Sequence, residues 1–381
     1  MRFLHLGDLH IGKRVNEFPM IADQRFALDA LARMAAEHAV DAVLIAGDFY
    51  DKPVPSEQAV MLAGSFLEEL HRAGIAVLIV PGNHDSAERL SFLSGVIGDD
   101  GIRIARPYGG KVERVMFSDK AGDVAVHLLP YVTPSDVRRC HPESGARTFD
   151  EAVRAVVEHM DIDAGIRNVL VAHQLVLGSS QPLRSDSEQA SIGGLDEVSA
   201  DALSPFDYVA LGHLHSPQWV VPGRIRYCGS PLKYSFSEAG RDKTASIVEL
   251  DGGRRVELEE LPVPMLHDMA EARGTLAEVR ELACEQPGLA DCYMKVVLTE
   301  PVEDAKAKLQ DLFPLLMRVE FDYAGQDGKA DTAQRPADIE ELEPGDVFAE
   351  LFEKMHGRVM DDEERHALED VLAKVGEGGA R

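Results

Sequence analysis

Five short apolar runs, each followed directly by Asp, Asn or His, constrain the fold of this chain more than any other feature. Their length and β-branched content predict buried strands, and helical patterns separate the first three. Such alternation predicts a mainly parallel sheet, and in open α/β sheets ligands bind beyond the strand ends. We therefore expect the polar residues after the runs to meet at one edge of a sheet. The five runs cover residues 2–6, 43–46, 75–80, 169–171 and 208–211.

The polar residues after the runs have the chemistry of metal ligands. Oxygen ligands mixed with imidazole nitrogens suit manganese or a similar divalent ion better than an ion that prefers thiolates. Two such ions, roughly 3.5–4 Å apart, would activate a nucleophile and offset the charge of a phosphodiester. Asp48 is the predicted bridge, because a carboxylate can offer one oxygen to each ion and an imidazole cannot. The predicted ligands are Asp8, His10, Asp48, Asn83, His173, His213 and His215.

His84 directly follows a predicted ligand and is the candidate catalytic acid. It could protonate the leaving oxygen or hold the transition-state phosphate, and Asp85 could orient it or cap the turn. Taken alone, a His at a strand end is usually structural, and a Gly-Asp pair is usually a turn. Five such coincidences with compatible residue types favour the metal site. The predicted catalytic residues are therefore His84 and Asp48.

Beyond these motifs, the chain divides into a large domain and a small one. Its 381 residues exceed the roughly 250–300 residues that one core usually serves. Further β-rich stretches up to residue 250 predict a second sheet, so residues 1–262 are expected to form a two-sheet α/β sandwich. Pro262 and Pro264 interrupt regular structure at its end. Residues 263–323 alternate strand and helix patterns and predict a small α/β domain. Its expected elements are helices over 275–282 and 302–309 and strands over 293–298 and 315–323.

The remaining residues predict a linker and two helices. Residues 324–345 are rich in Gly, Asp, Glu and Pro and have little apolar content. In residues 346–381 apolar side chains recur at helical spacing, which favours docking on a partner protein over packing against the body. The predicted partner-binding residues are Phe348, Leu351, Phe352, Met355, Leu368, Val371 and Leu372.

Composition restricts where this chain works and on what. Four cysteines, none in a CxxC pair, argue against a zinc ribbon or disulfide scaffold and favour a reducing cytoplasm. The sequence predicts neither a signal peptide nor a membrane span. A formal net charge of −27 disfavours tight, unassisted binding to nucleic acid. After the last run, basic residues form either a local patch or ordinary solvated surface; they are Arg224, Arg226, Lys233, Arg241 and Lys243. The first three are the predicted DNA-binding residues.

Several of these motifs together resemble the calcineurin-like metallophosphoesterase superfamily. Within it, residues 172–174, 185–188 and 229–238 are similar to the SbcD family of bacterial nuclease subunits, relatives of the meiotic-recombination repair nuclease. The similarity is strong over residues 1–250 and architectural beyond them. The superfamily motifs are Asp8-Leu9-His10, Gly47-Asp48, Gly82-Asn83-His84-Asp85, His173 and Gly212-His213-Leu214-His215.

The resemblance implies an Mn²⁺-dependent DNA nuclease of DNA repair, a 3′–5′ exonuclease on double-strand ends and an endonuclease on single strands and hairpins. It implies a DNA-capping domain after the nuclease domain, and C-terminal helices that bind an SMC-type ATPase of the SbcC family. A homodimer of this chain would stand within that heterotetramer. Some relatives have His where this chain has Asp51, so no role is assigned to Asp51. The implied ligand sets are Asp8, His10, Asp48 and His215 for one Mn²⁺, and Asp48, Asn83, His173 and His213 for the other.

Two other functions fit parts of the sequence. A phosphodiesterase or phosphatase acting on a small nucleotide or a phosphoprotein would have the same site, but it would not need the linker and the tail helices. A structural subunit, whose ions only stabilise the fold, would not need His84 beside the metal ligands.

Overall fold

A computed structural model of the chain describes residues 1–92, 94, 101–178, 182–188, 196–322 and 365. The chain divides into two compact units, Met1–Asp322 and Tyr323–Arg381, and nearly all described residues belong to the first. The predicted linker and tail helices lie outside the described residues, apart from Arg365. Among the helices described, none is long and apolar enough to cross a membrane.

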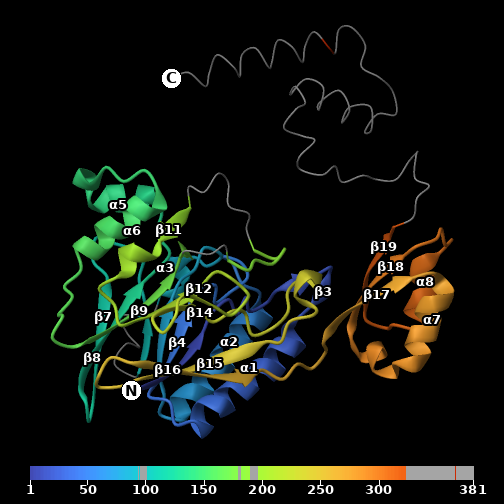
Figure 1. The fold of residues 1–381 in the computed structure, drawn as a ribbon, viewed down its shortest axis with the longest axis horizontal. Helices are drawn as coiled ribbons and strands as arrows, with labels where there is room; N and C mark the ends of the chain where they lie inside the picture. Colours follow the sequence, from blue (N-terminus) through green and yellow to red (C-terminus); the bar gives the residue numbers. More distant parts are fainter. Residues whose placement is uncertain (93, 95–100, 179–181, 189–195, 323–364, 366–381) are drawn as a thin grey trace. The chain divides into compact units, whose positions relative to one another are not determined.

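Two six-stranded sheets pack face to face in the larger part of the first unit (Figure 1). In the first sheet four parallel strands adjoin two antiparallel ones, and α1 and α2 pack on its outer face. In spatial order the strands are β16 (Val256–Pro262), β15 (Thr244–Leu250), β1 (Arg2–Leu6), β4 (Ala42–Ala46), β5 (Ala76–Val80) and β6 (Ile102–Ile104). The helices on this side are α1 (Ile21–Glu37), α2 (Glu57–Arg72) and the short α3 (Ala87–Leu90).

The second sheet has four parallel strands with an antiparallel strand at each edge. In spatial order they are β13 (Gln218–Val221), β14 (Ile225–Tyr227), β12 (Tyr208–Gly212), β9 (Arg167–His173), β8 (Gly122–Leu129) and β7 (Glu113–Asp119). On its outer face pack α5 (Pro134–Cys140) and α6 (Phe149–Glu158). Shorter pieces are β2 (Arg14–Val15), β3 (Phe18–Pro19), β10 (Leu175–Leu177), β11 (Glu197–Ser199), and the 3-10 turns η1 (Pro142–Ser144), η2 (Ala200–Leu203) and η3 (Phe236–Glu238).

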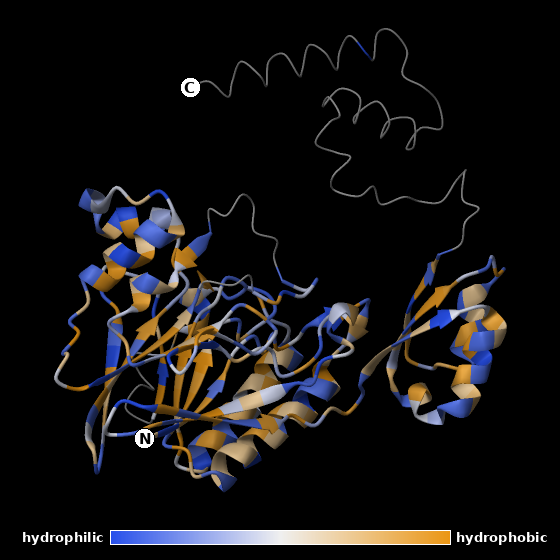
Figure 2. Ribbon diagram, in the orientation of Figure 1, coloured by the Kyte–Doolittle hydropathy of each residue, from blue (hydrophilic) through white to orange (hydrophobic). Residues whose placement is uncertain are grey.

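Alternation along each strand decides which core a side chain joins. In β4, Leu44 belongs to the layer between the two sheets, whereas Val43 and Ile45 pack with the helices outside. Strands buried on both faces need almost continuous apolar sequence, which explains the runs that predicted them. Figure 2 shows this concentration of apolar residues in the strands of both sheets.

Residues 269–321 form a small α/β arrangement with a core of its own. Its three strands are parallel. Asp23 of α1, itself buried, accepts hydrogen bonds from Tyr293 Oη at 2.7 Å and from the His267 backbone N–H at 3.1 Å, which joins this arrangement to the sandwich. Its elements are β17 (Met269–Gly274), α7 (Leu276–Glu285), η4 (Pro287–Asp291), β18 (Tyr293–Leu298), α8 (Ala305–Gln310) and β19 (Leu316–Phe321).

The predicted two-sheet α/β sandwich and small α/β arrangement are confirmed. The expected boundary at residue 262 coincides with the end of β16. Residues 1–322 nevertheless form one compact unit, so a separate capping domain over 263–323 stays a prediction.

Candidate metal centre

The loops that carry the predicted ligands follow the carboxyl ends of strands from both sheets, and their backbone is strained. Asp8, His10, Asp48 and His213 have φ values of 52°, 43°, 48° and 106°. Residues other than glycine rarely adopt this left-handed region, and strain of this kind gathers at functional sites. Neighbouring backbone holds it in place: the N–H groups of Asp8 and His10 donate to the carbonyl oxygens of Gly47 and Asp48, at 3.1 and 2.9 Å.

Close approach of the loops requires glycine at two points. A Cβ atom on Gly212 would lie 1.9 Å from the carbonyl oxygen of Ala46, and one on Gly82 would lie 2.2 Å from Oδ1 of Asp48. Both distances are far shorter than van der Waals contact, so any side chain would push the loops apart. These glycines allow loops from the two sheets to reach one centre.

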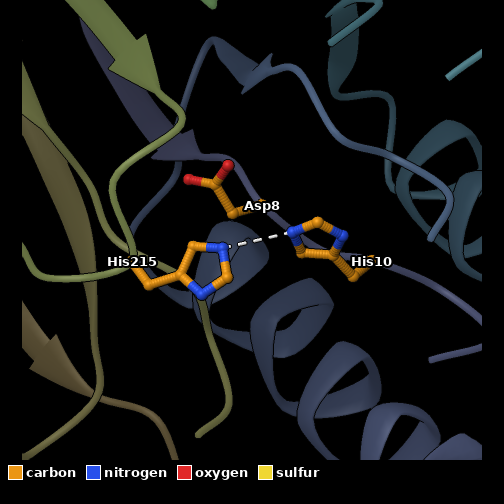
Figure 3. Close-up of side chains that lie close together, drawn as sticks. All are labelled: Asp8, His10 and His215. Carbon is orange, nitrogen blue, oxygen red and sulfur yellow. Dashed lines mark hydrogen bonds between the residues drawn. The ribbon is translucent and has the colours of Figure 1, made fainter. Parts of the chain in front are cut away.

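Asp8, His10 and His215 form one side of the centre (Figure 3). Their side chains are buried, and one ligand atom from each lies within 4.8 Å of the others. The Nε2 atoms of His10 and His215 face each other at 3.2 Å, and His10 Nε2 is 3.6 Å from Oδ2 of Asp48. The other nitrogen of His215, Nδ1, lies 2.8 Å from Oγ of Ser187.

Asn83, His173 and His213 form the other side. Oδ1 of Asn83 lies 2.9 Å from Nε2 of His173 and 3.2 Å from Nδ1 of His213. His173 Nε2 is also 3.3 Å from Oδ2 of Asp48. One carboxylate oxygen of Asp48 therefore faces both sides, where a bridging ligand is expected. All seven predicted ligands are brought together.

Burial and charge set the protonation of these groups. Burial lowers the pKa of His213 to about 3 and the pKa of His10 well below its usual value, so both imidazoles are neutral. Burial alone would raise the pKa of Asp48, but the charge and hydrogen bond of His173 hold it well below its usual range. Burial also raises the pKa of Asp8 to about 6, which still leaves it largely ionised at neutral pH. Burial lowers the pKa of His173 as well, but the carboxylates of Asp48 and Asp8 outweigh it and raise that pKa to about 9. Ionised carboxylates and neutral imidazoles are the forms that bind a metal ion, so a cation bound here would take the place of the His173 Nε2 proton.

The donor set fits divalent cations. His173 Nδ1 donates to the carbonyl oxygen of Ala46 at 2.8 Å, which fixes the ring so that Nε2 faces Asp48. His10 Nδ1 is buried without a hydrogen-bond partner among the described residues. Mixed oxygen and nitrogen donors suit manganese and similar ions. Two divalent ions held there would supply Lewis acidity toward a phosphodiester.

His84 lies beside the ligands, and one of its ring nitrogens is within 4.8 Å of ligand atoms of His10 and Asp48. Its backbone N–H donates to Oδ1 of Asp48 at 2.9 Å, and its ring lies edge-on to that of His10 with centroids 4.8 Å apart. Asp85 does not orient the ring. Its carboxylate accepts the backbone N–H groups of Phe49, Tyr50 and Gly82 at 3.0, 2.8 and 2.9 Å, so it caps the turn.

Comparison with known proteins places this arrangement in a family. A family model described as calcineurin-like phosphoesterase matches residues 1–217, more than half of the chain. The chain belongs to this family. A second model, described as Type 5 capsule protein repressor C-terminal domain (SbcD_C), matches residues 265–356.

Individual proteins similar to this phosphoesterase share 26% or less of its sequence. The D subunit of the SbcCD nuclease of Staphylococcus epidermidis is 26% identical over 384 residues, which cover 99% of this chain and 100% of that protein. A crystal structure of a protein from Thermus thermophilus is 12% identical with a TM-score of 0.37, and covers 68% of this chain and 98% of its own. A dimetal phosphatase from Danio rerio is 13% identical with a TM-score of 0.37, and covers 70% of this chain and 99% of its own.

Behind the ligands of this phosphoesterase lies a partly buried polar layer that sequence reasoning missed. The backbone N–H of His215 donates to Glu188 at 2.8 Å, and Ser187 contacts both His215 and Glu238. Glu238 pairs with Lys243. Residues 185–188 and 229–238 stand out in the sequence only through their resemblance to a family. Nothing in their local pattern indicates burial.

Three of the five residues in the predicted basic patch, Arg226, Lys233 and Lys243, are buried. Arg226 is 3% exposed and pairs with Glu260, and Lys233 is 5% exposed and pairs with Asp268 at 2.6 Å. Charges buried and neutralised in this way are not presented to a DNA backbone. Arg224 is half-buried, and its contact with DNA stays a prediction.

Proposed function

We propose that this phosphoesterase is a DNA nuclease subunit of the SbcD type that uses two Mn²⁺ ions. Its activities would be 3′–5′ exonuclease on double-strand ends and endonuclease on single strands and hairpins, in DNA end processing and repair. The observation that carries the proposal is that the ligand set around Asp48 and the SbcD_C match over 265–356 occur in one chain. A phosphoesterase for small substrates would account for the first but not for the second.

His84 would act on the substrate. Its Nδ1 lies 3.1 Å from the carbonyl oxygen of Asp51, which can only accept a hydrogen bond, so Nδ1 carries a proton. In the imidazolium form Nε2 also carries a proton, which it can give to the leaving oxygen or donate in a hydrogen bond to a phosphoryl oxygen. The ring is half-buried beside Asp48, so it can reach both the substrate and water. One ion would be held by Asp8, His10 and His215, the other by Asn83, His173 and His213, and Asp48 would bridge them.

The proposed partner is an SbcC-like ATPase of the SMC type, bound in the cytoplasm as a heterotetramer that contains two copies of this chain. The SbcD_C match extends beyond residue 346, into the segment whose apolar residues recur at helical spacing. A chain with a net charge of −27 holds DNA weakly by itself, because phosphate contacts need Lys and Arg. A partner that makes many of the contacts with the DNA phosphates would reconcile nuclease activity with this negative charge.

The test is hydrolysis by the purified full chain, with and without its ATPase partner, of blunt double-stranded DNA, hairpin DNA and bis-p-nitrophenyl phosphate. Mn²⁺, Mg²⁺ and Zn²⁺ would be compared, and His84→Ala is the control. The proposal predicts Mn²⁺-dependent DNA cleavage that His84→Ala abolishes. Hydrolysis of the small ester alone, even with the partner present, would favour a small-substrate phosphodiesterase instead.

The partner proposal has its own test. A chain ending at residue 345 should lose binding to the ATPase and keep hydrolysis of the small ester. Loss of both together would argue against a docking role for 346–381.

A further inference from the structure

A second group of metal-binding side chains lies on the outer face of the second sheet, among residues that the phosphoesterase centre does not use. His141 directly follows α5, Glu143 lies in η1, and His159 directly follows α6. Figure 1 shows α5 and α6 side by side, and they are in contact in the core beneath them. One ligand atom from each of the three side chains lies within 4.8 Å of the others.

Both imidazoles are anchored through their outer nitrogens. Nδ1 of His159 lies 2.7 Å from the carbonyl oxygen of Ala155, which can only accept, so Nδ1 is protonated and Nε2 carries a lone pair when the ring is neutral. Nε2 of His141 lies 2.9 Å from Oη of Tyr108. The remaining nitrogens, His141 Nδ1 and His159 Nε2, both face Oε1 of Glu143. Metal-binding histidines are commonly held in this way by a group on the far side of the ring.

The spacing of the inner atoms fits a shared cation better than hydrogen bonds. Glu143 Oε1 is 3.4 Å from His141 Nδ1 and 3.6 Å from His159 Nε2, longer than the roughly 2.7–3.2 Å of an N–H···O bond. Two ligands of one tetrahedral zinc ion, each bound at about 2.0–2.1 Å, are separated by about 3.3–3.4 Å.

The phosphoesterase centre of the same structure provides a comparison. There, Asp48 Oδ2 lies 3.3 Å from His173 Nε2 and 3.6 Å from His10 Nε2. The peripheral group therefore has the nitrogen-to-oxygen spacing that the structure gives to the ligands of a metal centre.

We propose that His141, Glu143 and His159 form a separate site for Zn²⁺ or a similar borderline divalent ion. Two imidazoles and one carboxylate are the donors such ions prefer, whereas Mg²⁺ and Ca²⁺ prefer oxygen donors alone. The side chains of His141, Glu143 and His159 are 12%, 65% and 42% exposed, so the site opens to solvent and water completes the coordination. In this site the ion links the C-terminal ends of α5 and α6.

The competing explanation is a simple ionic cluster. The two imidazole rings lie with centroids 4.0 Å apart and tilted by 34°, and Glu143 would pair with whichever ring is protonated. Such a cluster needs no metal ion. The ionic cluster would also not depend on which His141 tautomer the Tyr108 hydroxyl group stabilises. A metal site would depend on it, because His141 Nδ1 must be unprotonated to bind the ion.

The test counts bound ions in the full-length chain. Protein stripped with a chelator is dialysed against Zn²⁺, and bound zinc is measured by mass spectrometry. His159→Ala should bind one zinc ion per chain fewer than wild type, while it keeps Mn²⁺-dependent hydrolysis of bis-p-nitrophenyl phosphate, which shows that it folds. His71→Ala removes an exposed histidine elsewhere and should bind as much zinc as wild type. Equal zinc content in wild type and His159→Ala would overturn the proposal.

Tyr108→Phe gives a second measurement. It removes only the hydroxyl group behind His141, and loss of such a partner weakens metal binding by about 10–100-fold. We expect that loss of zinc affinity at this site alone, with the phosphoesterase centre unaffected. Unchanged affinity in Tyr108→Phe would mean that His141 is not held as a ligand, which also contradicts the proposal.

Discussion

The buried Lys243–Glu238 pair behind the metal centre gives the sharpest test of how this site is supported. The side chains are 2% and 0% exposed. Lys243 Nζ donates to Oε2 of Glu238 at 2.5 Å, to the carbonyl oxygen of His215 at 2.9 Å and to Oγ of Ser230 at 2.8 Å. Oε1 of Glu238 accepts from Ser187 at 2.9 Å. The ammonium group thus holds both a metal ligand's backbone and the carboxylate behind that ligand.

Replacing Lys243 with Met keeps the volume and leaves the charge of Glu238 buried without its partner. Breaking a buried ion pair from one side costs about 3–5 kcal/mol. Replacing both partners is often close to neutral, because no buried charge then remains uncompensated. The double variant Lys243→Met/Glu238→Gln should therefore be more stable than the single variant Lys243→Met.

The assay is urea unfolding followed by circular dichroism, with the free metal concentration held fixed because bound ions stabilise the folded state. Lys120→Met, at an exposed turn, is the matched control and should change stability by no more than about 0.5 kcal/mol. If Lys243→Met falls within about 1 kcal/mol of wild type, or the double variant is less stable than the single one, the reasoning about the buried pair is wrong.

Three further predictions concern the catalytic group, the sheet contact and the small α/β arrangement. His84→Ala should lower kcat by about 10²–10⁴-fold with bound metal unchanged by mass spectrometry; loss of metal would make its role structural. Gly212→Ala should lower the free energy of unfolding, measured in urea, by about 1–3 kcal/mol and weaken metal binding, because the new Cβ would lie 1.9 Å from the Ala46 carbonyl oxygen. Wild-type stability in this variant would contradict that close approach. Tyr293→Phe removes a hydrogen bond to buried Asp23 and should lower the free energy of unfolding by about 1–3 kcal/mol. Hydrogen exchange should then be faster at the amides of β18, and unchanged exchange would mean that the bond contributes little.

Strand positions, and the residues that meet at the candidate metal centre, were predictable from the sequence because both depend on short-range patterns. The run at residues 2–6 and the strand expected at 293–298 match β1 and β18 end to end. A strand buried on both faces must be apolar along its length, and its polar successors mark where it leaves the core. The helices expected at 275–282 and 302–309 exist, but α8 starts three residues later than expected, at Ala305.

The supporting charges were not predictable by the same reasoning. Lys and Glu are almost never fully buried unless paired, so a sequence reader assigns them to the surface. The partners that bury Arg226 and Lys233 are 34 and 35 residues away in the chain, and the contact from Lys243 to His215 spans 28 residues. Only the folded arrangement of β14, β15 and β16 brings such groups together. Burial of charge is a property of tertiary structure, and local pattern carries no signal for it.

Backbone conformation at the ligands leads to a related conclusion about what positions them. Asp8, His10, Asp48 and His213 have positive φ, which local preference would assign to glycine, at a cost of roughly 1–3 kcal/mol each. That cost persists only because hydrogen bonds between neighbouring strand ends over-determine the loops, as between Asp8 N–H and the Gly47 carbonyl. The sheets, rather than the preferences of the loops, therefore set the ligand geometry. A change that loosens the contact between the two sheets should disturb metal binding even where no ligand is touched.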